Sequence, residues 1–267
     1  MEEYISDNSL YIRSKNNSMI NRKMIGRVLG MLLFIELGMF LLCAGVSAGY
    51  GESDYKYFLY TCIINAVVGG LLLLYGRGAE NKMSRRDGYC VVTLSWVFFT
   101  FFGMLPFYFS GSIDTITNAF FETMSGFTTT GATILDDIES LSHGMLFWRS
   151  LTQWIGGLGI VFFTIAILPI FTTGGVQLFS AESTGVTHDR THPKINVMAK
   201  WLWTIYLVLT ISETVLLMFG GMSLFDAICQ SFATTATGGY STKQNSISYW
   251  NSPYIEYVVA IFMIVSS

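Results

Sequence analysis

Charged residues are scarce in this sequence. Lys, Arg, Asp and Glu make up 12% of the 267 residues, whereas ordinary soluble domains carry roughly 25%. Four cysteines are too few for a disulfide scaffold, the 26 glycines follow no three-residue period, and 15% aromatic residues exclude a disordered chain. The net charge of -3 gives no indication of nucleic-acid binding. The chain has too little polar surface for a water-soluble domain.

Motifs for catalysis and metal binding are also missing. The cysteines have no paired spacing, and we interpret them as small buried apolar residues: Cys43, Cys62, Cys90 and Cys229. His188 and His192 have the spacing of a helical metal clip, but the adjacent Pro193 favours a loop. The sequence has no nucleophile–base set, paired catalytic carboxylates or phosphate-binding Gly-Lys-Ser/Thr motif. We therefore expect neither an enzyme nor a bound cofactor.

Long apolar segments are what the sequence has instead. Five of them are long enough for a helix that crosses a bilayer, which takes about 20 residues: 28–48, 57–75, 89–109, 150–171 and 201–219. A sixth begins at Tyr254 and has reached only fourteen residues at Ser267. We expect an all-α polytopic membrane protein whose chain continues beyond residue 267, because a helix ending inside the bilayer leaves carbonyls without partners.

Lys and Arg lie on one side of these segments. They precede the first segment, and they recur between the second and third and between the fourth and fifth: Arg13, Lys15, Arg22, Lys23, Arg27, Arg77, Lys82, Arg85, Arg86, Arg190, Lys194 and Lys200. The other connections are mainly acidic, as at Asp136 and Asp137. The positive-inside rule therefore places the N-terminus in the cytoplasm.

Two connections are too apolar for solvated loops. Residues 110–149 and 220–253 each contain a short helix-like stretch followed by a Thr/Gly run, 128–133 in the first and 234–242 in the second. Apolar stretches of 10–14 residues suit a re-entrant half-helix. A Thr/Gly run at membrane depth can present backbone carbonyls to a dehydrated cation. The runs therefore indicate an ion filter, with ordinary Thr/Gly-rich turns as the alternative.

The two units align at a separation of 108 residues. This register pairs Thr129 with Thr237 and Gly131 with Gly239, whereas a shift by one residue pairs Gly131 with Gly238. We keep both glycines as candidates. Each unit reads as span, re-entrant pore helix, filter strand and span. Since about four such strands are needed to surround a cation, we expect about two of four repeats here.

Three motifs carry a family resemblance. They are Ser125-Gly-Phe-Thr-Thr-Thr-Gly-Ala-Thr133, Arg149-Ser-Leu-Thr-Gln-Trp-Ile-Gly-Gly-Leu-Gly-Ile160 and Ala236-Thr-Gly-Gly-Tyr-Ser-Thr242. In order and spacing they resemble the Trk/Ktr/HKT superfamily of potassium transporters, and within it the bacterial TrkH-type uptake subunits. The resemblance implies K⁺ as the transported ion and filter residues Thr129, Thr130, Gly131, Thr237, Gly238 and Gly239. It also implies a homodimer in the bacterial inner membrane and a cytoplasmic nucleotide-binding regulatory subunit of the TrkA type.

On this interpretation the chain has five parts. We expect a cytoplasmic segment at 1–27, an extra helix pair at 28–87, the first repeat at 88–172, a cytoplasmic loop at 173–200 and the second repeat at 201–267, truncated in its last helix.

Several other residues stand out near the expected filter. Arg149 and Gln153, one helical turn apart, are candidates to support the filter loop or to bind the Asp136–Asp137 pair. The glycines at 156, 157 and 159 favour close helix packing over a gating hinge.

Two carboxylates lie inside apolar segments, where the default expectation is a function or a buried partner. We expect a structural hydrogen bond at Glu36, which lies outside the repeats, while Glu213 is nearer the expected pore and has no evident partner.

A second function fits the same half-helices. A secondary transporter of another cation or a small solute also builds a midplane site from broken helices. The Thr/Gly run directly after each half-helix favours the filter, because an organic solute usually requires side-chain donors and an apolar lining.

The charge asymmetry generates a topology prediction. Single cysteines introduced at Asp136 and Lys243 should react with an impermeant thiol reagent in intact cells, while cysteines at Arg85 and His192 should react only after permeabilisation. Labelling of position 192 from outside contradicts the predicted orientation.

Overall fold

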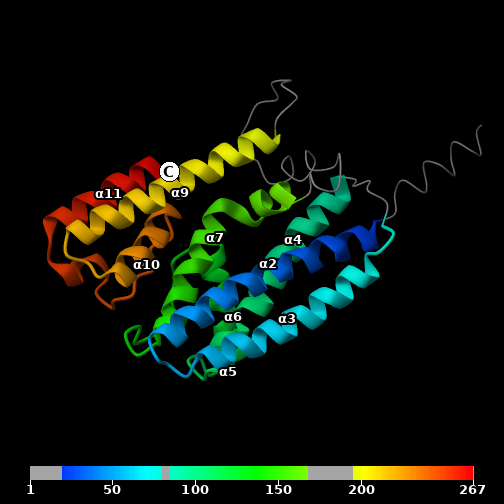
Figure 1. Cartoon of the computed structure of the whole chain (residues 1–267), viewed down its shortest axis with the longest axis horizontal. Helices are drawn as coiled ribbons and strands as arrows, with labels where there is room; N and C mark the ends of the chain where they lie inside the picture. The colour runs from blue at the N-terminus through cyan, green and yellow to red at the C-terminus, as the bar shows by residue number, and fades with distance from the viewer. Residues whose placement is uncertain (1–19, 80–84, 168–194, 267) are drawn as a thin grey trace, which may run out of the picture.

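The computed structural model describes residues 20–79, 85–167 and 195–266, and the regular structure in these ranges is helical (Figure 1). The elements are α2 (Arg22–Gly49), α3 (Tyr55–Tyr75), α4 (Arg85–Gly103), α5 (Leu105–Phe109), α6 (Ile116–Phe127), α7 (His143–Ile167), α9 (Ile195–Phe219), α10 (Leu224–Thr235), the 3-10 helix η2 (Ser246–Trp250) and α11 (Pro253–Ser266). Most of the expected cytoplasmic segment and loop, with His188, His192 and Pro193, lies outside the described residues.

Within the described residues, four helical stretches are long and apolar enough to cross a membrane. They are Arg22–Gly49, Tyr55–Tyr75, Arg86–Phe109 and Lys200–Phe219. Four of the five expected spans are thereby confirmed with shifted ends. The third has a break between α4 and α5 at Met104, where Pro106 lies in the first turn of α5 and has no backbone N–H to continue the helix.

The expected span over 150–171 is described as far as Ile167, and in that part it is helical but not one straight helix. Helix α7 begins earlier, at His143, and Gly159 inside it has φ 68° and ψ 139°, so two helical parts meet at a kink. Figure 1 shows the change of direction in α7. Glycine adopts positive φ without the steric cost that other residues meet there, which permits the break at this position.

Helices α2 and α3 form a closely packed antiparallel pair (Figure 1). A Cβ added at Gly30 would lie 2.9 Å from the Gly69 carbonyl oxygen, so glycine permits the contact. Glu36 on α2 is fully buried and accepts a hydrogen bond from Asn65 Nδ2 on α3 at 3.0 Å. The expected structural hydrogen bond at Glu36 is confirmed.

The free cysteines follow the sequence interpretation only in part. Cys43, Cys62 and Cys229 are buried, as expected for small apolar residues, whereas Cys90 is half-buried.

The loop between α2 and α3 caps the start of α7. Glu52 accepts hydrogen bonds from the His143 backbone N–H at 2.9 Å and from the Gly144 N–H at 3.4 Å, and His143 Nδ1 lies 2.7 Å from its carboxylate. The His143 ring stacks on Tyr50 at 3.9 Å and meets Phe225 at the start of α10 edge-on. The helix pair is thereby joined to both repeats.

We expect Glu52→Gln to weaken this cap. Burial raises the pKa of Glu52, but the hydrogen bonds from His143 and Gly144 outweigh it and leave that pKa below 4.5. The stabilisation is therefore complete at neutral pH and is lost as pH falls through the lowered pKa. Loss of such a cap costs about 1 kcal/mol, or roughly 2–4 °C in melting temperature.

Thermal unfolding in detergent between pH 7 and pH 3.5 measures the effect. The control is Asp54→Asn in the same loop, because the Asp54 side chain makes no capping hydrogen bond. Equal melting temperatures for wild type and Glu52→Gln at pH 7 contradict the assignment.

Candidate functional site

Each repeat contains a 12-residue helix that begins at a hydroxyl cap. In α6, Thr115 Oγ1 accepts a hydrogen bond from the Asn118 N–H at 3.2 Å. In α10, Ser223 Oγ accepts one from the Asp226 N–H at 3.1 Å. Each of these residues in the second repeat stands 108 positions after its counterpart in the first. The two helices therefore start in the same register.

The same register holds where the helices end. At the C-terminal end of α6, the backbone N–H of Thr129 donates to the Gly126 carbonyl oxygen at 3.0 Å and that of Thr130 to the Ser125 carbonyl oxygen at 3.0 Å. At the C-terminal end of α10, the equivalent bonds run from Thr237 to Thr234 and from Gly238 to Ala233, both at 2.8 Å. The geometry resolves the choice left by the sequence, because it pairs Thr129 with Thr237 and Gly131 with Gly239.

Both Thr/Gly segments leave their helix through the same unusual backbone conformation. Thr129 has φ 53° and Thr237 has φ 52°, and two residues later Gly131 has φ 74° and Gly239 has φ 85°. Positive φ is a genuine outlier for a β-branched residue and costs about 1–3 kcal/mol. The two outliers at equivalent positions show that both repeats hold the same costly backbone conformation.

The two segments lie against each other. A Cβ added at Gly131 would collide with the carbonyl oxygen of Gly238 and lie 3.2 Å from its carbonyl carbon. A Cβ at Gly238 would meet the Gln153 side chain, with Oε1 at 2.6 Å. At Gly239 the same addition meets no atom within 4 Å. Close approach of other atoms therefore favours glycine at Gly131 and Gly238, and positive φ favours it at Gly131 and Gly239.

A buried ion pair lies behind the first segment. Arg149 on α7 and Glu122 on α6 are 2% and 1% exposed, and Arg149 Nε donates to Glu122 Oε1 at 2.8 Å. Glu122 also accepts from Thr133 Oγ1 at 2.9 Å and from the Ile134 N–H at 3.0 Å. Both carboxylate oxygens are therefore hydrogen-bonded.

The second segment is held by the same helix α7. Arg149 Nη1 donates to the Ser241 carbonyl oxygen at 3.0 Å, and Gln153 Oε1 accepts from the Tyr240 N–H at 3.0 Å. Arg149 thus contacts the second Thr/Gly segment and helix α6, and its buried partners are Glu122 and Ser241 and not the Asp136–Asp137 pair. Asp137 Oδ1 instead accepts from the backbone N–H of Glu139 at 3.1 Å.

The adjacent glycines of α7 fit between the ends of the two short helices. A Cβ at Gly156 would lie 2.7 Å from the Phe127 carbonyl carbon at the end of α6. A Cβ at Gly157 would lie 2.8 Å from Ala236 Cα at the end of α10. The expectation of close packing is confirmed at both positions, while Gly159 forms the kink.

Glu213 lies beside the end of α10. Its Oε2 accepts from Thr235 Oγ1 at 3.4 Å, and its Oε1 is buried without a hydrogen-bond partner among the described residues. Thr235 is thus a partner that the sequence did not reveal.

Sequence reasoning missed two residues of the site, Glu122 and Tyr240. The signal for Glu122 was a single carboxylate inside an otherwise apolar half-helix, which requires a buried partner. Tyr240 gave no comparable signal, because a tyrosine after a Gly-Gly pair is compatible with any turn.

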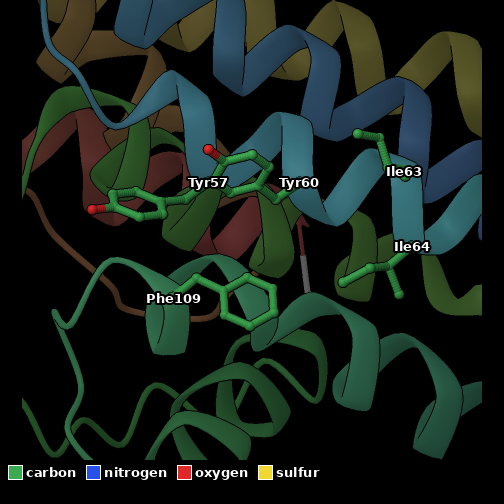
Figure 2. Close-up of a pocket in the computed structure, with 5 residues that line it drawn as sticks. All are labelled: Tyr57, Tyr60, Ile63, Ile64 and Phe109. Carbon is green, nitrogen blue, oxygen red and sulfur yellow. The ribbon is translucent and has the colours of Figure 1, made fainter.

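A separate cavity of about 430 Å³ lies between α3 and α5 (Figure 2). Its lining is largely apolar and consists of Tyr57, Tyr60, Ile63, Ile64 and Phe109. None of these residues belongs to the Thr/Gly segments, so the cavity is not part of the candidate site.

Comparisons with known proteins agree on one family. The model of the TrkH cation transport protein family matches residues 55–267. The Trk system potassium uptake protein TrkH of Escherichia coli (strain K12) is 42% identical over 244 residues, which cover 91% of this chain and 50% of that protein. TrkH of Halomonas elongata is 36% identical over 247 residues, with coverage of 92% and 51%.

A solved structure shows the same fold. The crystal structure of the potassium transporter TrkH from Vibrio parahaemolyticus matches with a TM-score of 0.78 at 34% identity, covering 92% of this chain and 50% of that one. The chain spans about half the length of the relatives it matches.

We expect Gly156→Ala to destabilise the fold and Gly70→Ala not to. A methyl group at Gly156 collides with the backbone of Phe127, and overpacking costs roughly 1–3 kcal/mol. At Gly70 in α3 the added Cβ meets no atom within 4 Å, and alanine favours a helix by about 1 kcal/mol. Melting temperatures in detergent should therefore shift in opposite directions. A Gly156→Ala protein as stable as wild type rules out the close packing.

Proposed function

The chain belongs to the TrkH family of cation transport proteins, and from this we propose that it forms part of a potassium-uptake pathway across the bacterial inner membrane. The observation that carries the proposal is the pair of Thr/Gly segments that leave their helices at equal φ angles 108 residues apart. The N-terminus lies in the cytoplasm in this proposal, as the Lys/Arg distribution predicts.

In the proposed pathway the backbone of the two segments selects the ion. Carbonyl oxygens of Thr129, Thr130, Gly131, Thr237, Gly238 and Gly239 replace part of the hydration shell of K⁺. Support comes from the fixed conformation of both segments, which keeps the ligand positions constant, and from the glycines, which leave room for close approach. K⁺ is the transported ion in this scheme and no resident cofactor is needed.

The electrostatics of the site suit a cation. The C-terminal ends of α6 and α10 adjoin the Thr/Gly segments, and the C-terminus of a helix carries about half a negative elementary charge. The guanidinium of Arg149 would oppose a nearby cation, but its charge is balanced by Glu122 at 2.8 Å. The geometry thus favours positive charge at the helix ends.

Arg149 and Gln153 act as filter supports in this proposal. Both side chains are buried, and each binds the backbone of the second segment, at Ser241 and Tyr240 respectively. These contacts fix the carbonyls without using side-chain ligands for the ion.

Regulation and assembly follow the relatives in this proposal. Two copies form a dimer, and a separate cytoplasmic subunit of the TrkA type binds nucleotide, since the sequence has no phosphate-binding Gly-Lys-Ser/Thr motif. Support for the regulator comes from relatives that are named as parts of the Trk system.

We expect Gly131→Ser and Gly239→Ser to lower K⁺-over-Na⁺ discrimination. Serine at φ 85° strains the backbone of Gly239 without filling occupied space, whereas serine at Gly131 adds a collision with Gly238. Strain of about 1–3 kcal/mol corresponds to roughly fivefold to a hundredfold in relative affinity. The measurement is Rb⁺ uptake with Na⁺ competition by the full-length protein in a potassium-uptake-deficient bacterium, normalised to protein in the membrane.

Gly221→Ser is the matched control. Gly221 has φ 95°, and a Cβ there meets no atom within 4 Å, so the backbone cost resembles that at Gly239 outside the Thr/Gly segments. Its discrimination should equal that of wild type. Unchanged discrimination in both filter variants with normal expression refutes the carbonyl filter and favours a transporter with a side-chain site.

A further inference from the structure

The hydroxyl of Tyr240 crosses from the second repeat to the first. Tyr240 follows Gly239 directly, is 2% exposed, and its hydroxyl lies 2.9 Å from the Glu122 carbonyl oxygen and 3.3 Å from the Ala132 carbonyl oxygen. Its single proton is therefore shared between two backbone carbonyls of the first repeat. Building on the proposed filter, we propose that Tyr240 is a positioning residue that sets the separation of the two Thr/Gly segments and thereby the K⁺-over-Na⁺ discrimination.

The contact point on the first repeat lies next to the proposed ion ligands. Ala132 follows Gly131, and its carbonyl oxygen also accepts a hydrogen bond from Ser125 Oγ at 2.6 Å. The Ala132 carbonyl is thus held by one hydroxyl from its own pore helix and one from the other repeat. A displacement of Ala132 moves Gly131, whose neighbour across the gap is the Gly238 carbonyl.

Tyr240 is itself immobilised by α7. Its backbone N–H donates to Gln153 Oε1 at 3.0 Å, and the Arg149 guanidinium carbon lies 3.6 Å from the centroid of its ring. A cation over an aromatic face in a desolvated site is attracted by the electron-rich face of the ring. Tyr240 is therefore a fixed spacer, because its backbone belongs to the second segment and its hydroxyl contacts the first repeat.

The repeats differ at this position. The residue 108 positions before Tyr240 is Ala132, which accepts the hydrogen bond that Tyr240 donates. The alanine side chain has no group that could donate in return, so among the residues described this side-chain link runs in one direction only. One residue therefore controls one distance, and a single substitution tests it.

The test is Tyr240→Phe in the full-length protein. Phenylalanine keeps the ring under Arg149 and the core volume and removes only the two hydroxyl contacts, so the protein should still reach the membrane in near-normal amount. One buried hydrogen bond contributes about 1 kcal/mol, which predicts a threefold to tenfold fall in K⁺-over-Na⁺ discrimination. Rb⁺ uptake with Na⁺ competition, normalised to membrane protein, measures it.

Tyr249→Phe provides the matched control, because Tyr249 belongs to the same repeat and is 51% exposed. Its discrimination should equal that of wild type. Ser125→Ala removes the other hydroxyl on the Ala132 carbonyl and should shift discrimination in the same direction as Tyr240→Phe. It therefore decides the question if Tyr240→Phe reaches the membrane in low amount.

The outcomes separate this inference from the filter proposal. The role of Tyr240 is overturned, and the filter stays intact, if Tyr240→Phe keeps wild-type discrimination while Gly239→Ser loses it. Where Tyr240→Phe fails to accumulate, wild-type discrimination in Ser125→Ala has the same meaning. Wild-type discrimination in the tyrosine variant and in both glycine variants overturns both. A fall in melting temperature with unchanged discrimination means that the hydroxyl is only structural.

Discussion

The ion pair between Glu122 and Arg149 is the interaction on which the arrangement of the two repeats depends. Burying both charges is costly unless each is fully hydrogen-bonded, and removal of one partner from such a pair costs about 3–5 kcal/mol. Here Glu122 accepts further hydrogen bonds from Thr133 and Ile134 in the loop of the first repeat, and Arg149 donates to the backbone of the second repeat at Ser241. The charges are stable only when both Thr/Gly segments occupy their places. The packing of the two repeats against each other and the neutralisation of the buried Arg149 charge therefore depend on the same contacts.

The repeats share a backbone plan but not a chemistry. Gln230 stands where the register places the counterpart of Glu122, and its Nε2 donates to Thr234 Oγ1 at 3.3 Å within its own helix. The same 108-residue register pairs Tyr240 with Ala132. The hydrogen bonds that close α6 and α10 are equivalent, whereas the side chains that link the repeats are unique to one of them. Symmetry thus resides in the main chain, where the proposed ion ligands are, and asymmetry in the side chains behind it.

The sequence predicted the features that depend on local composition. The apolar lengths of α2, α3, α4–α5 and α9 were readable because a bilayer imposes its thickness on them. The half-helices were readable because Thr/Gly runs end them. The kink at Gly159 was not, since three nearby glycines look alike and only tertiary contacts show that Gly156 and Gly157 pack while Gly159 bends. Tyr240 was missed because its partner Glu122 lies 118 residues away.

The glycines of α7 have a mechanical consequence. Gly156 and Gly157 hold the N-terminal part of this helix against the ends of both short helices, and the non-helical Gly159 follows two residues later. The break at Gly159 gives the C-terminal part of α7 a direction of its own, which the contacts of Gly156 and Gly157 do not fix. The part of α7 that packs against the short helices and the part that follows Gly159 are therefore two separate helical segments, so the packing that holds the Thr/Gly segments in place does not dictate where the rest of the helix runs.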